Sequence, residues 1–390
     1  MTWREQFGQL ARTVEAVFPG DRDLDALFGL NRPLRVKLGL DITSPSVTIG
    51  NEIQLRNLRR FQELGHVPVL ILGDFTTLVG DPSGRDKSRP QLTREQVAKN
   101  EQTWKDQIGG VLDLARVEIR HNSEWLGRLG SEEILKLAGQ LTVAQMLERD
   151  SFKQRFAARN PIHLHEFLYC LFQGYDSVAV EADIEMGGSD QTFNLNIGRT
   201  LQKNAGLPPQ VCLTTPLLEG VDGSMKMSKS LGNAIGLDSP PKDMFGLATR
   251  VPDGLVERYF VLATDVPDEE IATLLAGDIW EAKKTMAEGL TARHYGADVG
   301  RREREEFERV FKHKELPEDI PEHVVESGVT AAVLVRDVFG LSGGEAKRLI
   351  KQGAVTLDGE LLSDPNAAVA VEGGEVLRAG KRRFARLRLR

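Results

Sequence analysis

LRVKLGLDITSPSVTIGNEIQLRNLRRFQELGHVPVLILG, which spans residues 34–73, decides the fold class. Its two ends, 34–40 and 67–73, have the continuous apolar character of strands buried in a parallel sheet. Gly65 suits the position after a helix C-terminus, and four apolar residues before it recur at helical spacing: Leu55, Leu58, Phe61 and Leu64. The stretch therefore predicts a strand, a loop, a helix and a second strand joined by a right-handed crossover.

Strands and helices continue to alternate over the first 220 or so residues. Further strands are predicted at 117–122 and 210–218, and a largely buried helix at 164–180. Such alternation is typical of an α/β domain built around a parallel sheet. We therefore expect a first domain of this class at 1–220.

The chain changes character after this point. Residues from 241 to about 325 are mostly charged amphipathic helix, and the Pro-punctuated stretch 315–325 is predicted to be a linker. The remaining segment is short and compact. We expect a helical second domain at 221–325 and a small third domain at 326–390.

The composition of the 390-residue chain is that of an ordinary globular protein, with 41% hydrophobic and 27% charged residues. Cys170 and Cys212 are its only cysteines, which excludes a disulfide framework and favours a reducing compartment. The N-terminal sequence has no signal-peptide pattern, and the longest apolar run, 67–73, is too short to span a bilayer. We expect a cytoplasmic protein with no membrane partner.

Charge is distributed unevenly along the chain. The formal net charge of −7 argues against nucleic-acid binding by the chain as a whole. Residues 330–390, however, contain eleven Lys/Arg and seven Asp/Glu, a net charge of +4 that leaves −11 for the rest. Such a basic segment suggests contact with a polyanion, and the alternative is a solubilising tail.

The loop that follows the first strand, residues 41–55, is a candidate phosphate-binding site. Ligands of open α/β sheets bind beyond the carboxyl ends of strands, and a helix N-terminus offers free N–H groups to an anion. Four groups could hold phosphate oxygens there: Thr43, Thr48, Asn51 and the backbone near Gly50. The alternative is a capped turn that binds nothing, with Asn51 as the N-cap residue.

A polar stripe interrupts the predicted buried helix. Tyr169, Gln173 and Asp176 share one face of a helix that is otherwise apolar. Because buried polar groups need partners, these side chains either satisfy one another or line a pocket for a small polar ligand. The segment GGSDQ follows, with glycines that allow close backbone approach and two polar side chains, Asp190 and Gln191.

Two glycine-rich loops carry charges that could bind a cation or an anion. The loop 73–93 includes Asp81 but does not fit the Walker phosphate loop. The loop MKMSKS, 225–230, places Lys226 and Lys229 between glycines, where flexible ammonium groups can follow a polyphosphate. The alternative is a solvated surface loop. The seven histidines show no metal-ligand spacing, so we expect no metal site.

Four segments in this order resemble the class I aminoacyl-tRNA synthetases, and most closely the bacterial tyrosyl-tRNA synthetase family. They are LGLDIT…TIGN, FTTLVGDPSGRDKSR, LYCLFQGYDSVAVEADIEMGGSDQ and KMSKSLGN. The C-terminal segment resembles the small RNA-binding module that ends these enzymes. The resemblance covers essentially the whole chain.

The resemblance implies three domains and a homodimer. They are a Rossmann-type parallel-sheet catalytic domain, a helical anticodon-binding domain and a small α+β RNA-binding domain. The implied reaction joins L-tyrosine to ATP, with Mg²⁺ bound to the nucleotide, and transfers the tyrosyl group to the 3′ end of tRNA(Tyr). The first step needs no acid–base side chain, because the substrate carboxylate attacks the α-phosphorus. Catalysis would come from positioning and charge stabilisation.

Roles in binding tyrosine follow from the resemblance. Tyr169, Gln173 and Asp81 would hold the ammonium group of the substrate. Asp176 would accept the phenolic hydrogen. Two further residues would bind the substrate: Lys37 near the phenol and Gln191 at the carboxyl group.

A second group would bind the nucleotide. Asp190 would bind the ribose, and Gly39 and Gly188 would flank the adenosine. The other implied ATP-binding residues are Asp41, Gly50, Met227, Ser228 and Lys229. The implied catalytic residues around the leaving pyrophosphate are Thr43, Thr48, Asn51, Lys226 and Lys229. The C-terminal residues implied to contact tRNA phosphates are Arg348, Lys351, Arg378, Lys381, Arg382, Arg383 and Arg386, followed by Arg388 and Arg390.

The sequence departs from the family at one signature. The usual His-Ile/Leu-Gly-His reads Thr48-Ile49-Gly50-Asn51 here. Thr48 is shorter than histidine and carries no charge, and loss of one such donor costs about 10²–10³ in rate by analogy with oxyanion donors. Three alternatives to an active tyrosine enzyme therefore stay open: a divergent paralogue, a catalytically silent RNA-binding protein on the same scaffold, and a tryptophan enzyme.

Overall fold

The computed structural model describes residues 2–83, 92–223, 226–228, 232–312, 320–380 and 383–390. The chain forms two compact units, Met1–Gly300 and Arg301–Arg390. The finer division into three domains stays a prediction.

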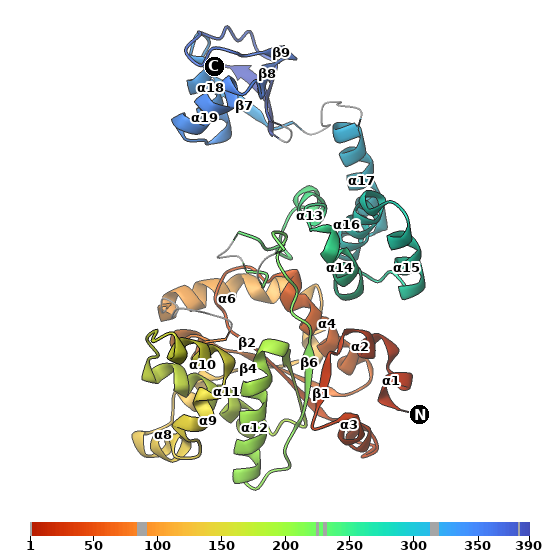
Figure 1. Cartoon of the computed structure of the whole chain (residues 1–390), viewed down its shortest axis with the longest axis vertical. Coiled ribbons are helices and arrows are strands. Elements are labelled where there is room, and N and C mark those ends of the chain that lie inside the picture. Colours follow the sequence, from red (N-terminus) through yellow and green to blue (C-terminus); the bar gives the residue numbers. More distant parts are fainter. Residues whose placement is uncertain (1, 84–91, 224–225, 229–231, 313–319, 381–382) are drawn as a thin grey trace. The chain divides into compact units, whose positions relative to one another are not determined.

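Within the described residues, the first unit is built on a six-stranded sheet of order β1-β6-β5-β2-β3-β4 (Figure 1). The neighbours from β6 to β4 pair in parallel, whereas β1 joins the edge antiparallel to β6. The strands are β1 Ala16–Phe18, β2 Arg35–Leu40, β3 Val67–Leu72, β4 Glu118–His121, β5 Ile184–Gly188 and β6 Val211–Thr215. The α/β class with a parallel sheet is confirmed, although β1 is too short to leave a recognisable pattern.

β2 is not the continuous apolar strand that its sequence predicts. Its segment buries apolar side chains on one face: Leu34, Val36, Leu38 and Leu40. Because side chains alternate along a strand, Arg35, Lys37 and Gly39 lie on the other face. That face lies against helix α11 (Leu164–Ala179), since Arg35 donates to the carbonyl oxygen of Val180 and Lys37 to that of Gln173.

Two crossovers leave the centre of the sheet in opposite directions. Helix α4 (Ile49–Glu63) joins β2 to β3, and α12 (Thr192–Asn204) joins β5 to β6 on the other side. Right-handed crossovers in opposite directions place their helices on opposite faces, and α12 packs against α11 (Figure 1). The strand order reverses between β2 and β5, which is where open sheets bind ligands. The predicted 164–180 helix and the glycine after α4, Gly65 at φ +84°, are confirmed.

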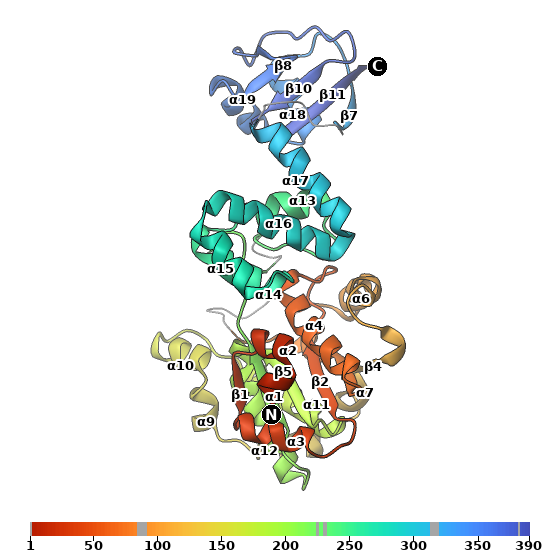
Figure 2. The ribbon, with the colours of Figure 1, turned by 90° about the vertical axis from the view of Figure 1, so that its right-hand side faces the viewer.

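The other helices of the first unit surround the sheet or follow it. Those before α11 are α1 Trp3–Gln6, α2 Gly8–Thr13, α3 Asp21–Phe28, α5 Thr76–Val79, α6 Arg94–Gly109, α7 Ser123–Leu126, α8 Ser131–Ala138, α9 Val143–Leu147 and α10 Asp150–Ala157. After β6 come α13 Pro241–Ala248, α14 Val256–Ala263, α15 Asp268–Ala276 and α16 Ile279–Tyr295, which gather into one bundle (Figure 2). Helix α17, Ala297–Lys312, begins in the first unit and continues into the second. The predicted helical character after residue 241 is confirmed.

Two contacts between ionisable side chains join this bundle to helices that lie beside the sheet. Arg12 of α2 lies 2.8 Å from Asp268 of α15. His294 of α16 lies 3.1 Å from Glu52 of α4, just beyond the turn that begins this helix. The bundle therefore contacts α4, the helix whose N-terminal turn is the predicted phosphate site.

The second unit is a small α+β fold. Its sheet has the order β7-β11-β10-β8-β9, and helices α18 and α19 cover an apolar core. The elements are β7 Glu322–Val325, α18 Ala331–Phe339, α19 Gly343–Lys351, β8 Val355–Leu357, β9 Glu360–Leu361, β10 Val376–Ala379 and β11 Arg383–Leu389. The predicted linker at 315–325 is wrong at its end, because β7 pairs in parallel with β11. The rest of that stretch, up to residue 319, lies outside the described residues.

Among the helices that the structure describes, none is both long and apolar enough to cross a membrane.

Candidate active site

The candidate site lies beyond the carboxyl ends of the parallel strands. Asp41 follows β2, Thr76 follows β3, Asn122 follows β4, and Asp190 follows β5. Gly39 is exposed although β2 is a central strand, and a Cβ atom there would meet nothing within 4 Å. The sheet is therefore open at the switch point between β2 and β5, where a ligand can lie against the backbone.

Asp176 forms the buried end of the polar stripe on α11. The indole nitrogen of Trp125 donates to its Oδ1 at 2.7 Å, and Asn122 Nδ2 donates to its Oδ2 at 3.2 Å. Burial raises the pKa of this carboxyl group to about 7, although Lys37 and these donors favour the charged form. The site therefore holds a preformed acceptor on the border of ionisation at neutral pH.

A hydrogen-bond chain links Asp176 to Tyr169. The Tyr169 hydroxyl donates to Asp41 Oδ2 at 3.1 Å, Thr76 Oγ1 donates to Asp41 Oδ1 at 2.7 Å, and Asn122 donates to Thr76 at 3.0 Å. Gly73 makes this possible, because a Cβ atom there would lie 2.4 Å from both Asp41 and Thr76 oxygens. The alternative that Tyr169, Gln173 and Asp176 hydrogen-bond to one another is thus wrong. Each of these side chains hydrogen-bonds to a residue of another element.

A second network surrounds Asp81. Gln191 Nε2 donates to its Oδ2 at 2.9 Å, and the Ser83 amide and Arg149 Nη2 reach its Oδ1 at 2.8 and 3.3 Å. Burial alone would raise the pKa of Asp81, but Arg149 and Ser83 outweigh it and hold the pKa below its usual range. Asn194 then connects Gln191 to Gln173, with 2.8 Å to each. Asp81 is therefore a charged acceptor suited to an ammonium group.

Asp190 lies in the part of the site that the family resemblance predicts to bind ATP. Lys226 Nζ lies 2.6 Å from Asp190 Oδ2. The other oxygen, Oδ1, is buried and has no hydrogen-bond partner within the described part of the chain. A Cβ atom at Gly188 would lie 2.6 Å from that oxygen, so a side chain at this position would collide with Asp190. A buried acceptor without a partner is a candidate ligand contact.

The Thr48-Ile49-Gly50-Asn51 turn begins α4 with a capping box. The N-cap residue is Thr48 and not Asn51, which corrects the capped turn considered above. Asn51 N–H donates to Thr48 Oγ1 at 3.4 Å, and the Thr48 amide donates to Asn51 Oδ1 at 3.3 Å. Thr48 Oγ1 also donates to Asn51 Oδ1 at 2.9 Å. The two polar side chains of the turn thus fix one another at the helix N-terminus.

Neighbouring segments hold this turn in place. The Ile49 amide donates to the carbonyl oxygen of Ile235, and the Leu237 amide donates to that of Val47. Met227 covers Gly50, since a Cβ atom on Gly50 would meet the Met227 side chain at 3.8 Å. The segment around the lysine loop therefore contacts the turn that was predicted to bind phosphate.

Helix α6 supports the loop between β2 and α4. Trp104 Nε1 donates to the Ser44 carbonyl oxygen at 2.7 Å, and Gln107 Oε1 accepts from the Val47 amide at 2.8 Å. Thr43 is half-buried in this loop.

Ser228, predicted to bind ATP, lies next to Met227, and its amide donates to Asn233 Oδ1 at 2.8 Å.

The structure does not bring every predicted residue to this site. Lys229, Lys381 and Arg382 lie outside the described residues. The remaining predicted RNA-binding residues lie in the second unit: Arg348, Lys351, Arg378, Arg383 and Arg386. Within the described residues, no group of three or more His, Cys, Asp or Glu side chains is placed to hold a metal ion.

Three site residues escape prediction from the sequence alone. Asn122 had a usable signal, because it directly follows a predicted strand, at the edge where ligands bind. Trp125 and Arg149 have none, since each lies in a short segment without periodicity. Arg149 is 5% exposed and reaches Asp81 from 68 positions further along the chain.

Comparison with known proteins identifies the family. Residues 30–312 match the family described as tRNA synthetases class I (W and Y). The chain is 48% identical over 385 residues to the tyrosine–tRNA ligase of Oleidesulfovibrio alaskensis, with 96% of each chain covered. It is 45% identical over 390 residues to the tyrosine–tRNA ligase 2 of Vibrio cholerae, with 98% of each covered.

A solved structure agrees in fold. The tyrosyl-tRNA synthetase from Archaeoglobus fulgidus, complexed with L-tyrosine, matches with a TM-score of 0.61 at 20% identity, over 77% of this chain and 99% of that one. A parallel sheet with a polar site beyond its strand ends, and a match over most of the length, lead to one conclusion. The chain belongs to the class I tRNA synthetases of the W and Y group.

Proposed function

We propose that the chain is a tyrosine–tRNA ligase, which activates L-tyrosine with ATP and transfers the tyrosyl group to the 3′ end of tRNA(Tyr). The observation that carries this proposal is the buried Asp176 carboxyl group with two donors already in place. The phenol of tyrosine differs from the phenyl group of phenylalanine by one O–H group, and a buried acceptor recognises that group. The names of the similar proteins support the same substrate.

The amino-acid pocket has a charge pattern that suits tyrosine. Asp81 would take the ammonium group, together with Tyr169 and Gln173, and Gln191 would meet the carboxylate. Burial and the neighbouring Asp41 raise the pKa of Tyr169, which therefore stays a neutral hydroxyl. The pocket thus presents an anion to the ammonium end and an acceptor to the phenol end.

Activation forms one bond and breaks another. A carboxylate oxygen of tyrosine bonds to the α-phosphorus of ATP, and the bond from that phosphorus to the bridging oxygen of pyrophosphate breaks. Lys226 and the N-terminus of α4 would stabilise the negative charge that develops on the leaving pyrophosphate. Mg²⁺ would enter bound to the phosphates of ATP, as part of the nucleotide substrate. The terminal ribose hydroxyl of tRNA then attacks the acyl carbon, and AMP leaves.

ATP binding would exchange the partner of Lys226. In this structure the Lys226 side chain is paired with Asp190 while 56% of it stays exposed. If the ribose hydroxyls take Asp190, the ammonium group is released toward the phosphates. The flexible lysine stem allows this movement.

The direct test is ATP–pyrophosphate exchange with a panel of aromatic amino acids. We expect exchange with tyrosine, and at least about tenfold less with phenylalanine or tryptophan. Phenylalanine has no donor for the buried Asp176 acceptor, and the larger indole ring of tryptophan carries its N–H group at a different position from the phenol O–H. A protein that shows no tyrosine-dependent exchange contradicts the proposal, and exchange with tryptophan alone favours the tryptophan enzyme.

Thr48 is expected to act through its cap. Thr48→Ala should lower the free energy of unfolding by about 1 kcal/mol and reduce kcat of exchange by less than about tenfold, since the hydroxyl is used within the turn. Urea denaturation and exchange kinetics measure both. Thr48→Ser keeps the cap and is the matched control. A loss of about 10²–10³ in kcat for the alanine variant would instead assign Thr48 a direct contact with the phosphates.

A homodimer is part of the proposal. Four apolar side chains are strongly exposed on the consecutive helices α8 to α11, which lie together at one side of the sheet (Figure 1): Leu135, Val143, Phe156 and Leu164. Large exposed apolar side chains are candidates for an interface, and we propose that these four take part in the dimer contact. Sedimentation velocity should give twice the chain mass of 43.2 kDa, and a monomer would contradict the proposal.

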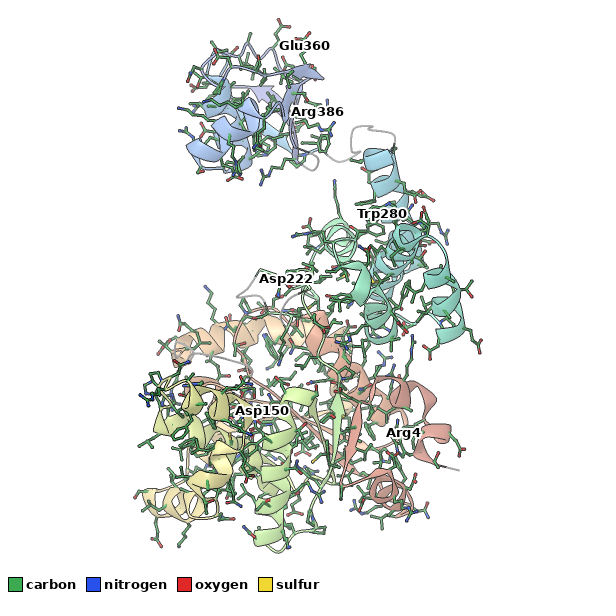
Figure 3. All side chains as sticks on the ribbon, in the orientation of Figure 1. Arg4, Asp150, Asp222, Trp280, Glu360 and Arg386 are labelled. Carbon is green, nitrogen blue, oxygen red and sulfur yellow. The ribbon has the colours of Figure 1, made fainter. Side chains whose placement is uncertain are left out.

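The second unit would bind tRNA. Arg386 lies on β11, whose other basic side chains include Arg383 and Arg388 (Figure 3). Arg388 lies 3.0 Å from Glu322 and Arg390 3.1 Å from Glu326, so these two are partly neutralised. Arg383 lies 3.7 Å from Glu345. The stronger candidates for phosphate contacts are therefore Arg386 of β11, Arg378 of β10, and Arg348 and Lys351 of α19.

Removing the part of the second unit that follows Lys312 should separate the two steps. The cut precedes β7, which belongs to the C-terminal sheet. We expect exchange within about threefold of wild type, while charging efficiency for tRNA falls at least about tenfold and loses part of its salt dependence. Charging assays over a salt series measure this. Unchanged charging of the shortened chain would mean that the basic strands are a solubilising tail.

The cytoplasmic location stays a prediction. A divergent paralogue also remains an alternative, and rescue of a strain that lacks its only tyrosyl enzyme would separate it from a housekeeping ligase.

A further inference from the structure

A buried ion pair lies beneath the amino-acid pocket. Lys37 of β2 and Glu185 of β5 are directly opposite one another in the parallel register, and neither is more than 1% exposed. Lys37 Nζ donates to Glu185 Oε1 at 2.7 Å, to Ser177 Oγ at 2.8 Å and to the Gln173 carbonyl oxygen at 3.0 Å. All three ammonium hydrogens therefore have acceptors.

The carboxylate of the pair is equally well satisfied. Ser177 Oγ donates to Glu185 Oε2 at 2.9 Å, and Gln210 Nε2 donates to the same oxygen. Burying two charges costs several kcal/mol per ion, and a well-packed apolar pair is often as stable. Stability alone is thus a weak reason for a lysine in the centre of this sheet.

The position of the ammonium group gives a better reason. Gln173 and Ser177 are one helical turn apart on α11, and Asp176 lies in that same turn. Lys37 therefore bonds the turn that presents both Gln173 and Asp176 to the pocket. With its three hydrogens committed, Lys37 has no donor left for a phenol, in contrast to the contact that the family resemblance implies.

Both charges of the pair act on Asp176. The charged and polar groups that act on Asp176 are Lys37 from β2, Glu185 from β5, Trp125 from α7 and Asn122 after β4. Against the effect of burial, the Lys37 charge lowers the pKa of Asp176 more than the Glu185 charge raises it. The positive end of the pair thus acts on the carboxyl group that would receive the phenol.

We propose that Lys37 and Glu185 are positioning residues for phenol recognition: the pair fixes the α11 turn and keeps a positive charge toward Asp176, so that this carboxyl group is ionised when tyrosine binds. Lys37 itself does not touch the substrate. This inference rests on the proposed function, because it names the residues that set the specificity of the same pocket.

The test is the double variant Lys37→Met/Glu185→Gln, which removes both charges and leaves no lone buried ion. The pH dependence of kcat/KM for tyrosine is measured by exchange. We expect its midpoint to move upward by about one pH unit, and KM for tyrosine near pH 7 to rise about tenfold. KM for ATP should stay within about twofold, and the preference for tyrosine over phenylalanine should fall.

A matched pair serves as control. Arg155 and Glu166 form another ion pair in which each side chain is 3% exposed, and Glu166 lies on α11 almost three turns before Asp176. Arg155→Met/Glu166→Gln should lose thermal stability without moving the midpoint. If the Lys37/Glu185 variant likewise loses stability but keeps the wild-type midpoint and preference, the pair is only structural and the inference is wrong. Absence of tyrosine-dependent exchange in the wild type would instead defeat the proposed function.

Discussion

Asp176→Asn is expected to lower kcat/KM for tyrosine by about 10²–10³. The variant loses a hydrogen bond to a charged group, worth about 1.5–3 kcal/mol, and its amide nitrogen must face a donor from Trp125 or Asn122. A buried donor without an acceptor costs about 1–3 kcal/mol more. Phenylalanine makes no such bond, so its low activity should change little and the preference for tyrosine should collapse.

The pH profile gives an independent check of the same prediction. Since burial raises the pKa of Asp176 to about 7, the wild-type kcat/KM for tyrosine should fall about tenfold per pH unit well below that value. The asparagine variant should lack this dependence. Asp74→Asn is a matched control, because Asp74 also lies beyond the end of a parallel strand, β3. Its carboxylate accepts from the amide and the hydroxyl of Ser123, at 2.9 Å and 2.5 Å. If Asp176→Asn keeps the wild-type kcat/KM for tyrosine and the wild-type pH profile, Asp176 has no role in phenol recognition.

The ionisation of Asp176 should have the opposite effect on stability: kcat/KM for tyrosine rises as this group ionises, whereas its contribution to the free energy of unfolding falls. The folded-state pKa of Asp176 lies above the unfolded value of about 4, so its ionisation opposes folding. This cost grows from about pH 4 to about pH 7 and then stays constant. The unfolding free energy of Asp176→Asn relative to wild type should therefore increase over that window, as thermal denaturation can measure.

Arg149→Met is expected to destabilise the folded chain by about 3 kcal/mol, because it leaves Asp81 without its positive partner. The estimate lies at the low end for a buried pair, since the Asp81 side chain is 23% exposed. Arg149 also donates to Cys170 Sγ at 3.1 Å and lies 5.3 Å from the centre of the Phe152 ring. Methionine fills much of the volume of Arg149 but cannot make its contacts with Cys170 and the Phe152 ring.

The charge effect can be separated from the packing effect. The pKa of Asp81 is depressed, so its contribution to stability is present at neutral pH and is lost as the pH falls below about 4. The destabilisation by Arg149→Met should shrink accordingly in acid. Urea denaturation at several pH values measures this. The double variant Asp81→Asn/Arg149→Met should regain much of the stability but still activate tyrosine poorly. A loss below about 1 kcal/mol at neutral pH would contradict the assigned role of Arg149.

The fold was predictable where periodicity was strong. The β2-α4-β3 segment was predicted to be two strands around an amphipathic helix, and the structure contains these elements. Only the continuous apolar character predicted for β2 is wrong, because one of its faces carries Arg35, Lys37 and Gly39. The N-cap was misassigned because Thr48 and Asn51 are both good capping residues and only the backbone conformation separates them. The end of the linker was wrong because β7 is held by its partner β11, whose position no local pattern reveals.

The candidate site was predictable only in part. Tyr169, Gln173 and Asp176 stand out because polar residues rarely interrupt an apolar helix. Their partners could not be inferred, since Asp41, Asn122 and Asn194 come from other elements.

The sequence by itself determined the α/β class, the helical segment after it and the residues that the family resemblance marks, because these depend on local spacing and on recognisable motifs. Only the tertiary structure decided what the charges do. It pairs Lys37 with Glu185 and Arg149 with Asp81, and it places Lys226 on Asp190. The physical reason is that a charge pair depends on distance in space and on burial, and both are set by which strands and helices become neighbours.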